Sequence, residues 1–283
     1  MRVGALAWQV GPGAGVDAWA ARLDQAVAAA DADLLFTAEY APVEMVAGAA
    51  PDLQGELSRA CDAAPAALDA ARAIAMRQHK WLLPGTLPWR DGGRIRNRAP
   101  LIAPDGRVAW QDKHVMTRFE TEHWGISPGA PPSVFDTDFG RIGIAICFDL
   151  EFPHLVRAQI EAGAWLILAP SCTDTAQGFN RVRIAAAARA MENQCFVAVA
   201  PTVGLAPWSA ALDVNHGQAT IFGPVDRGFP ADGVLAAGAM DAPGWVIADL
   251  DPASLDTVRR DGAVRNHLAW PAVPPACPVE RPQ

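Results

Sequence analysis

The sequence predicts an α/β protein with a mixed sheet. Short apolar runs typical of buried strands alternate along the chain with longer stretches of helical pattern. With 283 residues, 51% of them hydrophobic, the chain is long enough to enclose a large core. Near the middle, two strand-like runs flank the turn signal APDGR, which predicts an antiparallel hairpin over residues 94–114. A hairpin beside strands that are joined through helices implies both antiparallel and parallel pairs.

The individual elements follow from local patterns. Strands are predicted for six apolar runs, RVGALAWQV (2–10), DLLFTAEY (33–40), KWLLPGTL (80–87), RIGIAIC (141–147), AWLILAP (164–170) and CFVAVAP (195–201). Helices are predicted at 18–32 and 65–80, where alanine, leucine and arginine dominate and apolar residues recur every three or four positions. Residues 149–164 predict another helix, because an acidic start and a proline in the first turn are typical of a helix N-terminus.

Composition limits the domain organisation and the classes of partner. We expect one domain over residues 1–270 and an irregular tail at 271–283. The 23 basic and 31 acidic side chains give a formal net charge of −8, which provides no basic stripe for a nucleic acid. No run of about eighteen apolar residues is present, so we expect no membrane partner. The five scattered cysteines favour a reducing compartment, and we expect a cytoplasmic protein.

The stretch RIGIAICFDLE places Cys147 between a buried strand and a helix. Open α/β sheets bind their ligands at this position, outside the carboxyl ends of the strands. Helix N–H groups beside a thiol can lower its pKa below the usual ~8.5 and favour the nucleophilic thiolate. A lone cysteine is more often a small buried hydrophobic residue than a nucleophile, so Cys147 needs partners before it indicates chemistry.

Two charged residues at strand ends are candidates for those partners. The six histidines form no Cys-His signature, so a carboxylate is the alternative base. Glu39 ends the run DLLFTAEY, and Lys113 ends the strand-like run RVAWQDK. In such a cluster Glu39 would take the thiol proton, Lys113 would stabilise an oxyanion and Cys147 would attack.

The segments FTAEY, DKHVMTRFE and ICFDLEFP resemble, in order and separation, the three catalytic segments of the nitrilase superfamily of carbon–nitrogen hydrolases. The similarity covers nearly the whole chain and includes an Arg-Ala-x-Glu-Asn element over 189–193. The resemblance implies a four-layer αββα sandwich, a Glu-Lys-Cys triad and neither a metal nor an organic cofactor. A branch of uncharacterised amidohydrolase-like members is similar around Cys147 and at SCTDT.

Carried over residue by residue, the resemblance makes Glu39 the general base, Lys113 the oxyanion stabiliser and Cys147 the nucleophile. Members often use a second glutamate that orients the lysine and the substrate. Glu120 is the first candidate, because KHVMTRFETEHWG resembles the family spacing Lys-x-x-x-Thr-x-x-Glu-x-x-x-Trp-Gly. Glu122 is the alternative.

Other residues near these segments are candidates for binding the substrate or for structure. Those expected to contact the substrate flank the catalytic segments, and they are Trp124, Phe148, Ser171 and Cys172. Those expected to build a buried or dimer-facing ion-pair network share one predicted helix, and they are Arg181, Arg183, Arg189 and Glu192. The chain departs from the Cys-Tyr-Asp-x-Arg-Phe-Pro-Glu pattern of many members at Glu151 and His154, and Glu151 reverses a charge near the expected pocket.

The expected activity is therefore hydrolysis of a small amide through a thioester on the cysteine, with release of ammonia or an amine. Three alternatives remain at this point: nitrile hydrolysis, acyl transfer to a soluble acceptor, and a catalytically silent scaffold. The expected partners are a small-molecule amide and further copies of the chain, since the resemblance implies a homodimer or a larger homo-oligomer.

Overall fold

The computed structural model describes residues 1–12, 15–49 and 52–270, and it confirms the α/β class. Its strands are β1 (Arg2–Gln9), β2 (Leu34–Phe36), β3 (Trp81–Leu83), β4 (Leu87–Asp91), β5 (Arg94–Ile102), β6 (Val108–Asp112), β7 (Val134–Thr137), β8 (Gly140–Ile144), β9 (Leu166–Ser171), β10 (Phe196–Leu205), β11 (Val214–Asn215), β12 (Thr220–Phe222), β13 (Val234–Ala237) and β14 (Gly244–Asp249). Its α-helices are α1 (Val16–Ala29), α2 (Leu53–Gln78), α3 (Pro153–Glu161), α4 (Ala176–Asn193), α5 (Pro252–Asp261) and α6 (Asn266–Ala269). Shorter helical turns are η1 (Ala41–Val46), η2 (Glu120–Trp124) and η3 (Cys147–Glu151).

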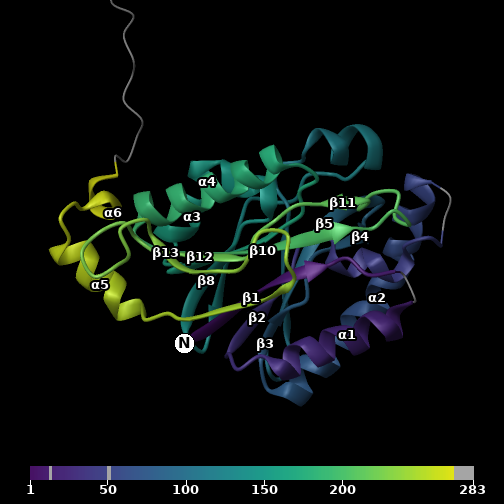
Figure 1. Ribbon diagram of the computed structural model, residues 1–283, viewed down its shortest axis with the longest axis horizontal. Coiled ribbons are helices and arrows are strands. Elements are labelled where there is room, and N and C mark those ends of the chain that lie inside the picture. Colours follow the sequence, from purple (N-terminus) through teal and green to yellow (C-terminus); the bar gives the residue numbers. More distant parts are fainter. Residues whose placement is uncertain (13–14, 50–51, 271–283) are drawn as a thin grey trace, which may run out of the picture.

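Two sheets pack between two pairs of helices, which is the expected four-layer αββα sandwich (Figure 1). The first sheet runs β14-β1-β2-β3-β5, with β4 and β6 also on β5, and the second runs β7-β8-β9-β10-β12-β13. The sheets are mixed, as predicted: β1, β2 and β3 are parallel, whereas β4, β5 and β6 pair antiparallel. The ends of β1 and β10 also pair in parallel, so hydrogen bonds connect the two sheets.

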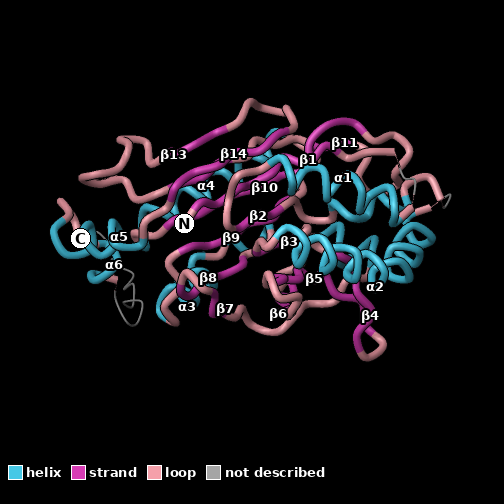
Figure 2. The backbone as a smooth tube through the Cα atoms, turned by 90° about the horizontal axis from the view of Figure 1, so that it is seen from below, coloured by secondary structure: helices cyan, strands magenta, loops and turns pink. Residues whose placement is uncertain are grey.

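Alternation along β1 separates the two sides of the first sheet. Val3 and Ala5 lie in the apolar cluster that includes the strands of the second sheet, whereas Leu6 and Trp8 pack with the side chains of α1 and α2. Successive side chains of a strand point to opposite faces, so one strand serves two layers. Figure 2 shows α1 and α2 side by side, in agreement with the contacts between them.

Some element boundaries differ from the expectation. The helix predicted at 65–80 begins at Leu53, because the Asp52 side chain caps it by accepting a hydrogen bond from Gly55 N at 2.7 Å. The patterns considered above predict none of the strands after β10, which are two to six residues long and lack long apolar runs. The tail predicted at 271–283 lies outside the described residues.

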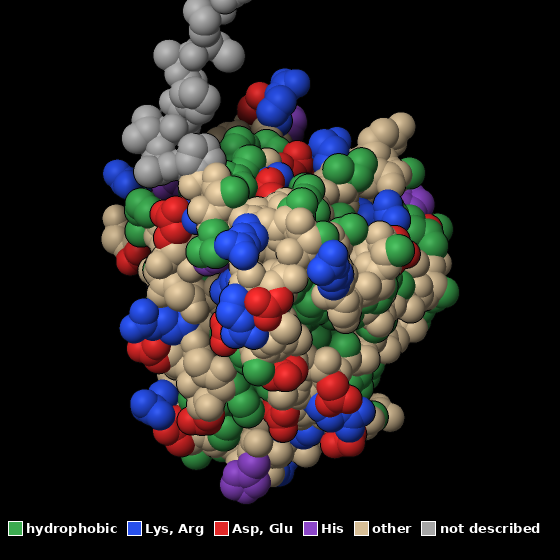
Figure 3. All heavy atoms as spheres, turned by 90° about the vertical axis from the view of Figure 1, so that its left-hand side faces the viewer, with side chains coloured by type: hydrophobic (Ala, Val, Ile, Leu, Met, Phe, Trp, Pro, Cys, Tyr) green, Lys and Arg blue, Asp and Glu red, His purple; other side chains and the backbone are tan. Residues whose placement is uncertain are grey.

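The surface carries charges of both signs, interspersed on the face shown in Figure 3. Within the described ranges, no helix combines the length and apolar character needed to cross a membrane. The parallel strands β2, β8 and β9 end at the same edge of the sandwich, and the residues just after these ends build the site described next.

Candidate active site

Cys147 lies at the predicted strand-to-helix turn. It follows β8 and opens η3, directly before α3. Its backbone φ of 47° falls in the left-handed region, which a non-glycine residue adopts only where the surroundings impose it. Tyr40, which follows Glu39, has a φ of 58°. Two strained backbone positions therefore flank the same site, as is typical of functional sites.

Glu39, Lys113 and Glu120 form one buried cluster. Lys113 Nζ donates hydrogen bonds to Glu39 Oε1 at 2.8 Å and to Glu120 Oε2 at 2.7 Å. The three side chains are 1 to 2% exposed. A buried ammonium is stable only when it is paired and hydrogen-bonded, and here two carboxylates from segments 81 residues apart share one lysine.

Further hydrogen bonds fix Glu120 and separate it from Glu122. Glu120 accepts hydrogen bonds from Tyr40 Oη at 2.7 Å and from the backbone N and the Oγ1 of Thr117, both at 2.9 Å. Glu122 is 48% exposed and pairs with Arg118 at 2.8 Å on the surface. The structure thus brings Glu120, and not Glu122, to Lys113.

Three residues of the site are absent from the sequence-based set. Asn97 Nδ2 donates to Glu39 Oε1 at 2.8 Å and to Glu120 Oε1 at 3.1 Å, so it bridges the two carboxylates. Tyr40 contacts Glu120 as described above. Asp149 accepts hydrogen bonds from the backbone N of His114 and Val115, at 3.0 and 2.7 Å, and so ties η3 to the segment after Lys113. The sequence signal for Tyr40 is its position next to Glu39, and that for Asp149 is its match to the Asp of the Cys-Tyr-Asp pattern that begins at Cys147.

Cys172 connects the thiol to the carboxylate cluster through its backbone. Cys147 Sγ donates to the Cys172 carbonyl at 3.6 Å, and Cys172 N donates to Glu39 Oε2 at 3.1 Å. The backbone of the residue that follows β9 thereby contacts both the Glu39 carboxylate and the Cys147 thiol. The Cys172 thiol itself lies 3.6 Å from Asn215 Oδ1, and burial raises its pKa to about 12.

The protonation pattern follows from burial and pairing. Burial raises the pKa of Glu39 above its usual value, and the charge of Glu120 raises it further against the opposing effect of Lys113. For Glu120, burial also acts to raise the pKa, but Lys113 and the hydrogen bonds to Glu120 outweigh it and the pKa is lowered. Burial favours neutral Lys113, yet the two carboxylates outweigh it and hold the pKa of this lysine well above its usual value. Glu39 is therefore the carboxylate more ready to carry a proton.

The expected lowering of the Cys147 pKa is not found. Burial raises the pKa of this thiol well above its usual value, and the negative charge of Glu39 adds to the effect. Lys113 opposes both without cancelling them. A thiol whose pKa is raised in this way is neutral near pH 7, so its activation requires a base, and the helix N-terminus alone does not supply a thiolate.

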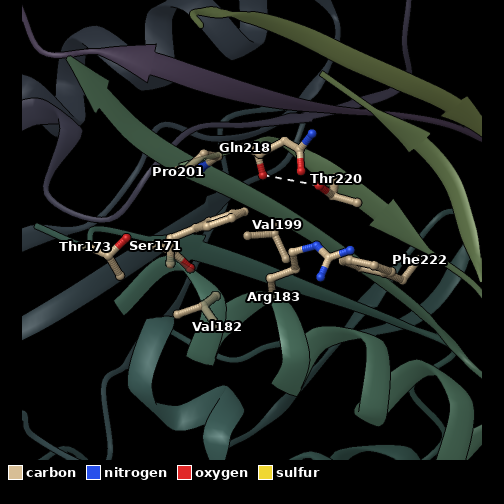
Figure 4. A pocket seen from close by; sticks show the side chains of 10 residues that line it. Ser171, Thr173, Val182, Arg183, Val199, Pro201, Gln218, Thr220 and Phe222 are labelled. Atoms are coloured by element: carbon tan, nitrogen blue, oxygen red, sulfur yellow. Dashed lines mark hydrogen bonds between the residues drawn. The ribbon is translucent and has the colours of Figure 1, made fainter. Parts of the chain in front are cut away.

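A cavity of about 560 Å³ opens onto these side chains and is large enough for a small organic molecule. Of the four residues expected to contact a substrate, Trp124, Phe148 and Cys172 line it. Ser171 instead lines a smaller neighbouring pocket (Figure 4), and its Oγ donates to the Ala169 carbonyl at 3.3 Å. Ser171 follows the alternation of β9, which turns its side chain away from the cavity.

The residues expected to form one ion-pair network on α4 form two separate ion pairs instead. Arg189 pairs with Glu192 at 2.9 Å on the partly buried face of the helix, and Arg181 faces Glu151 at 3.4 Å beside the cavity. Arg183 lies along the smaller pocket in Figure 4 and has no ion pair within the described part of the chain. The helix therefore carries separate pairs and not one network.

Within residues 1–12, 15–49 and 52–270, no group of three or more histidine, cysteine or acidic side chains is arranged to hold a metal ion.

The four-layer sandwich, with a cysteine and a Glu-Lys-Glu cluster at the strand ends, is that of a nitrilase-superfamily protein. The sequence profile of the carbon–nitrogen hydrolase family matches residues 7–260, and the chain belongs to that family.

Individual relatives match about two thirds of the chain. A probable hydrolase of Bacillus subtilis, YhcX, is 38% identical over 192 residues, which cover 68% of this chain but only 37% of that protein. The deaminated glutathione amidase of Synechocystis sp. is 28% identical over 210 residues, 70% of this chain and 74% of that protein.

Among solved structures, a mutant of the amidase from Nesterenkonia sp. AN1 superimposes with a TM-score of 0.72 and 25% identity. The match covers 92% of this chain and 94% of that one. In that amidase the acetamide moiety of fluoroacetamide is covalently added at the active site cysteine.

Proposed function

We propose that this protein is an amidase that hydrolyses a small, non-peptide amide through a thioester on Cys147. The observation that carries the proposal is the meeting of Glu39, Lys113 and Glu120 beside Cys147 at the cavity. Two of the similar proteins named above are amidases, and one of them reacts at its cysteine. These likenesses favour an amide over a nitrile as the substrate.

Glu39 serves as the base and then as the acid. It accepts the Cys147 proton as the sulfur bonds to the amide carbonyl carbon and the carbonyl π electrons move to oxygen. Lys113 and a backbone N–H stabilise the oxyanion. When the oxyanion collapses, the C–N bond breaks and Glu39 gives its proton to the departing ammonia or amine. The acyl group remains on Cys147 as a thioester.

Water completes the cycle. Glu39, again a carboxylate, takes a proton from water as the water oxygen attacks the thioester carbonyl. The C–S bond then breaks, the carboxylic acid product leaves, and Glu39 returns its proton to the Cys147 sulfur. Glu120 keeps its charge and holds Lys113 in place, in line with the lowered pKa of Glu120 and the four hydrogen bonds that it accepts from Lys113, Tyr40 and Thr117.

Two broader expectations stay proposals. We propose a cytoplasmic location, which rests on the odd and scattered cysteines. We also propose a homo-oligomer, because α4 carries exposed apolar side chains at Ile184 (63%) and Met191 (38%), seven residues apart on one face.

The test measures ammonia release from primary amides and nitriles of matched chain length, with mass spectrometry of the intact protein. Wild type should release ammonia from amides and carry an acyl adduct on Cys147. Cys147→Ala should lose both, whereas Cys61→Ala, which removes a buried thiol on α2, should lose neither. A folded protein that turns over no amide and stays unmodified at Cys147 would instead support the silent scaffold. Transfer of the acyl group to an added amine in preference to water would support the acyltransferase.

A further inference from the structure

Acidic side chains outnumber basic ones along the lining of the cavity. Of the charged side chains that line the cavity, those with a carboxylate are Glu39, Glu120, Glu151, Asp174 and Asp213, and those with a cation are Lys113, Arg118 and Arg181. Five acids thus face three bases. A cleft lined by an excess of one sign raises the local concentration of molecules of the opposite sign.

The cations of the cavity are already occupied. Lys113 is held between Glu39 and Glu120, at 2.8 and 2.7 Å. Arg118 pairs with Glu122 at 2.8 Å. A substrate carboxylate at Lys113 would therefore have to break a buried ion pair, and leaving a buried charge unpaired is costly.

Three acidic residues, Glu151, Asp174 and Asp213, form what we call the outer wall of the cavity, and their carboxylates are less strongly paired than those of Glu39 and Glu120. Asp174 and Asp213 are exposed and form no ion pair with any other residue in the described ranges. Glu151 is 20% exposed, and its partner Arg181, at 3.4 Å, is 61% exposed. Such an exposed pair contributes roughly 0–1 kcal/mol. A cation inside the cavity can therefore compete with Arg181 for Glu151.

Glu151 is also the position where the chain departs from the family pattern by a reversal of charge. It stands four residues after Cys147 in η3, so its placement relative to the nucleophile is set by one short turn. The structure shows that this departure faces the cavity.

From this arrangement we infer, resting on the proposed amidase function, that the preferred substrate is a primary amide whose acyl chain carries a cationic group, an ammonium or a guanidinium. Glu151 is the specificity-determining residue. It attracts the cation while the carbonyl lies at Cys147, and Asp174 and Asp213 increase the local concentration of such molecules at the cavity mouth. Amides that end in a carboxylate are disfavoured at the same wall.

Three amides of nearly equal length test the inference: 5-aminopentanamide with a terminal ammonium, hexanamide with a methyl group in its place, and glutaramate with a carboxylate. In wild type we expect kcat/KM to fall in that order. The ratio for 5-aminopentanamide over hexanamide should be about tenfold, equivalent to ~1.4 kcal/mol. It should shrink as salt is raised, because screening weakens charge attraction at an open site.

Variants assign the preference to one side chain. Glu151→Gln should bring the ratio close to one, and Glu151→Arg should make glutaramate the better substrate. Because the ratio compares two substrates of one enzyme preparation, it is insensitive to partial loss of folded protein. Glu161→Gln on α3, a glutamate 57% exposed and outside the cavity lining, should keep the wild-type ratio.

The experiment distinguishes a failure of the substrate preference from a failure of the proposed amidase activity. Hydrolysis of hexanamide without any preference for the ammonium compound, or an unchanged ratio in Glu151→Gln, would overturn the inference and leave the amidase intact. No hydrolysis of any of the three amides, with Cys147 unmodified in the folded protein, would overturn the proposed function and the inference together.

Discussion

At the scale of single residues, the site gives different pKa values to two carboxylates that share one lysine. Glu39 and Glu120 are both buried and both contact Lys113, yet the pKa of Glu39 is raised and that of Glu120 is lowered. At Glu39 burial dominates and the charge of Glu120 adds to it, whereas at Glu120 the attraction of Lys113 and the hydrogen bonds from Tyr40 and Thr117 outweigh burial. Two carboxylates whose pKa values differ in this way can have different roles in one reaction.

The raised pKa of Glu39 predicts the acid side of the pH profile. Glu39 must be ionised to accept the thiol proton, so activity falls as the pH drops through its raised pKa. We expect the acid-side midpoint of kcat/KM to lie above 4.5, the usual value for glutamate. Glu120, which has a lowered pKa, should cause no second decrease of kcat/KM above pH 4.5. A pH series with a neutral amide checks this, and a midpoint below 4.5 would contradict it.

The two glutamates of the KHVMTRFETEHWG segment should differ sharply when each is changed to glutamine. Glu120→Gln leaves Lys113 with one carboxylate, so we expect kcat/KM to fall roughly 100-fold and the free energy of unfolding to fall by about 3 kcal/mol. Glu122→Gln removes a surface pair and should change the free energy of unfolding by less than about 1 kcal/mol. Steady-state kinetics and urea unfolding measure both effects. Equal effects of the two variants would show that the buried contacts of Glu120 determine neither kcat/KM nor the free energy of unfolding.

At the scale of elements, η3 is fixed to the segment that follows β6. The carboxylate of Asp149 accepts from two successive backbone N–H groups there, and these groups directly follow Lys113. Cys147 and Lys113 belong to different sheets, so this contact sets their relative position.

Removing that contact should affect catalysis more than substrate binding. Asp149→Ala leaves two N–H groups without their acceptor, and we expect the free energy of unfolding to fall by about 3 kcal/mol. We also expect kcat to fall at least tenfold while KM changes less, because the displaced groups are Cys147 and Lys113. Asp136→Ala, an 84% exposed control, should change neither. An increase of KM with unchanged kcat would place Asp149 in substrate binding instead.

At the scale of the whole molecule, the exposed apolar face of α4 should be covered by a second copy of the chain. We expect wild type to run as a dimer or larger assembly in light scattering at micromolar concentration. Ile184→Asp should shift the mass toward the monomer, because burying an unpaired charge in an apolar interface is unfavourable. Val225→Asp, at another exposed apolar position, should not. A monomeric wild type would remove the basis of this prediction.

The α/β class, the hairpin and the turn at Cys147 could be predicted from the sequence. Each depends on a local signal: apolar periodicity, the APDGR turn, or the proline that begins α3. The resemblance of three short segments to one family also pointed to Glu39, Lys113 and Cys147, which the structure places together.

The finer features of the site could not be predicted from the sequence and depend on how the chain folds. The tertiary structure distinguished Glu120 from Glu122, brought Asn97 between two carboxylates, turned Ser171 away from the cavity, and raised the pKa of Cys147 where the turn alone suggested a lower value. The physical reason is that hydrogen bonds, burial and charge at a site depend on residues far apart in sequence. The contact between Cys172 N and Glu39, for example, spans 133 residues, a distance over which no local pattern carries information.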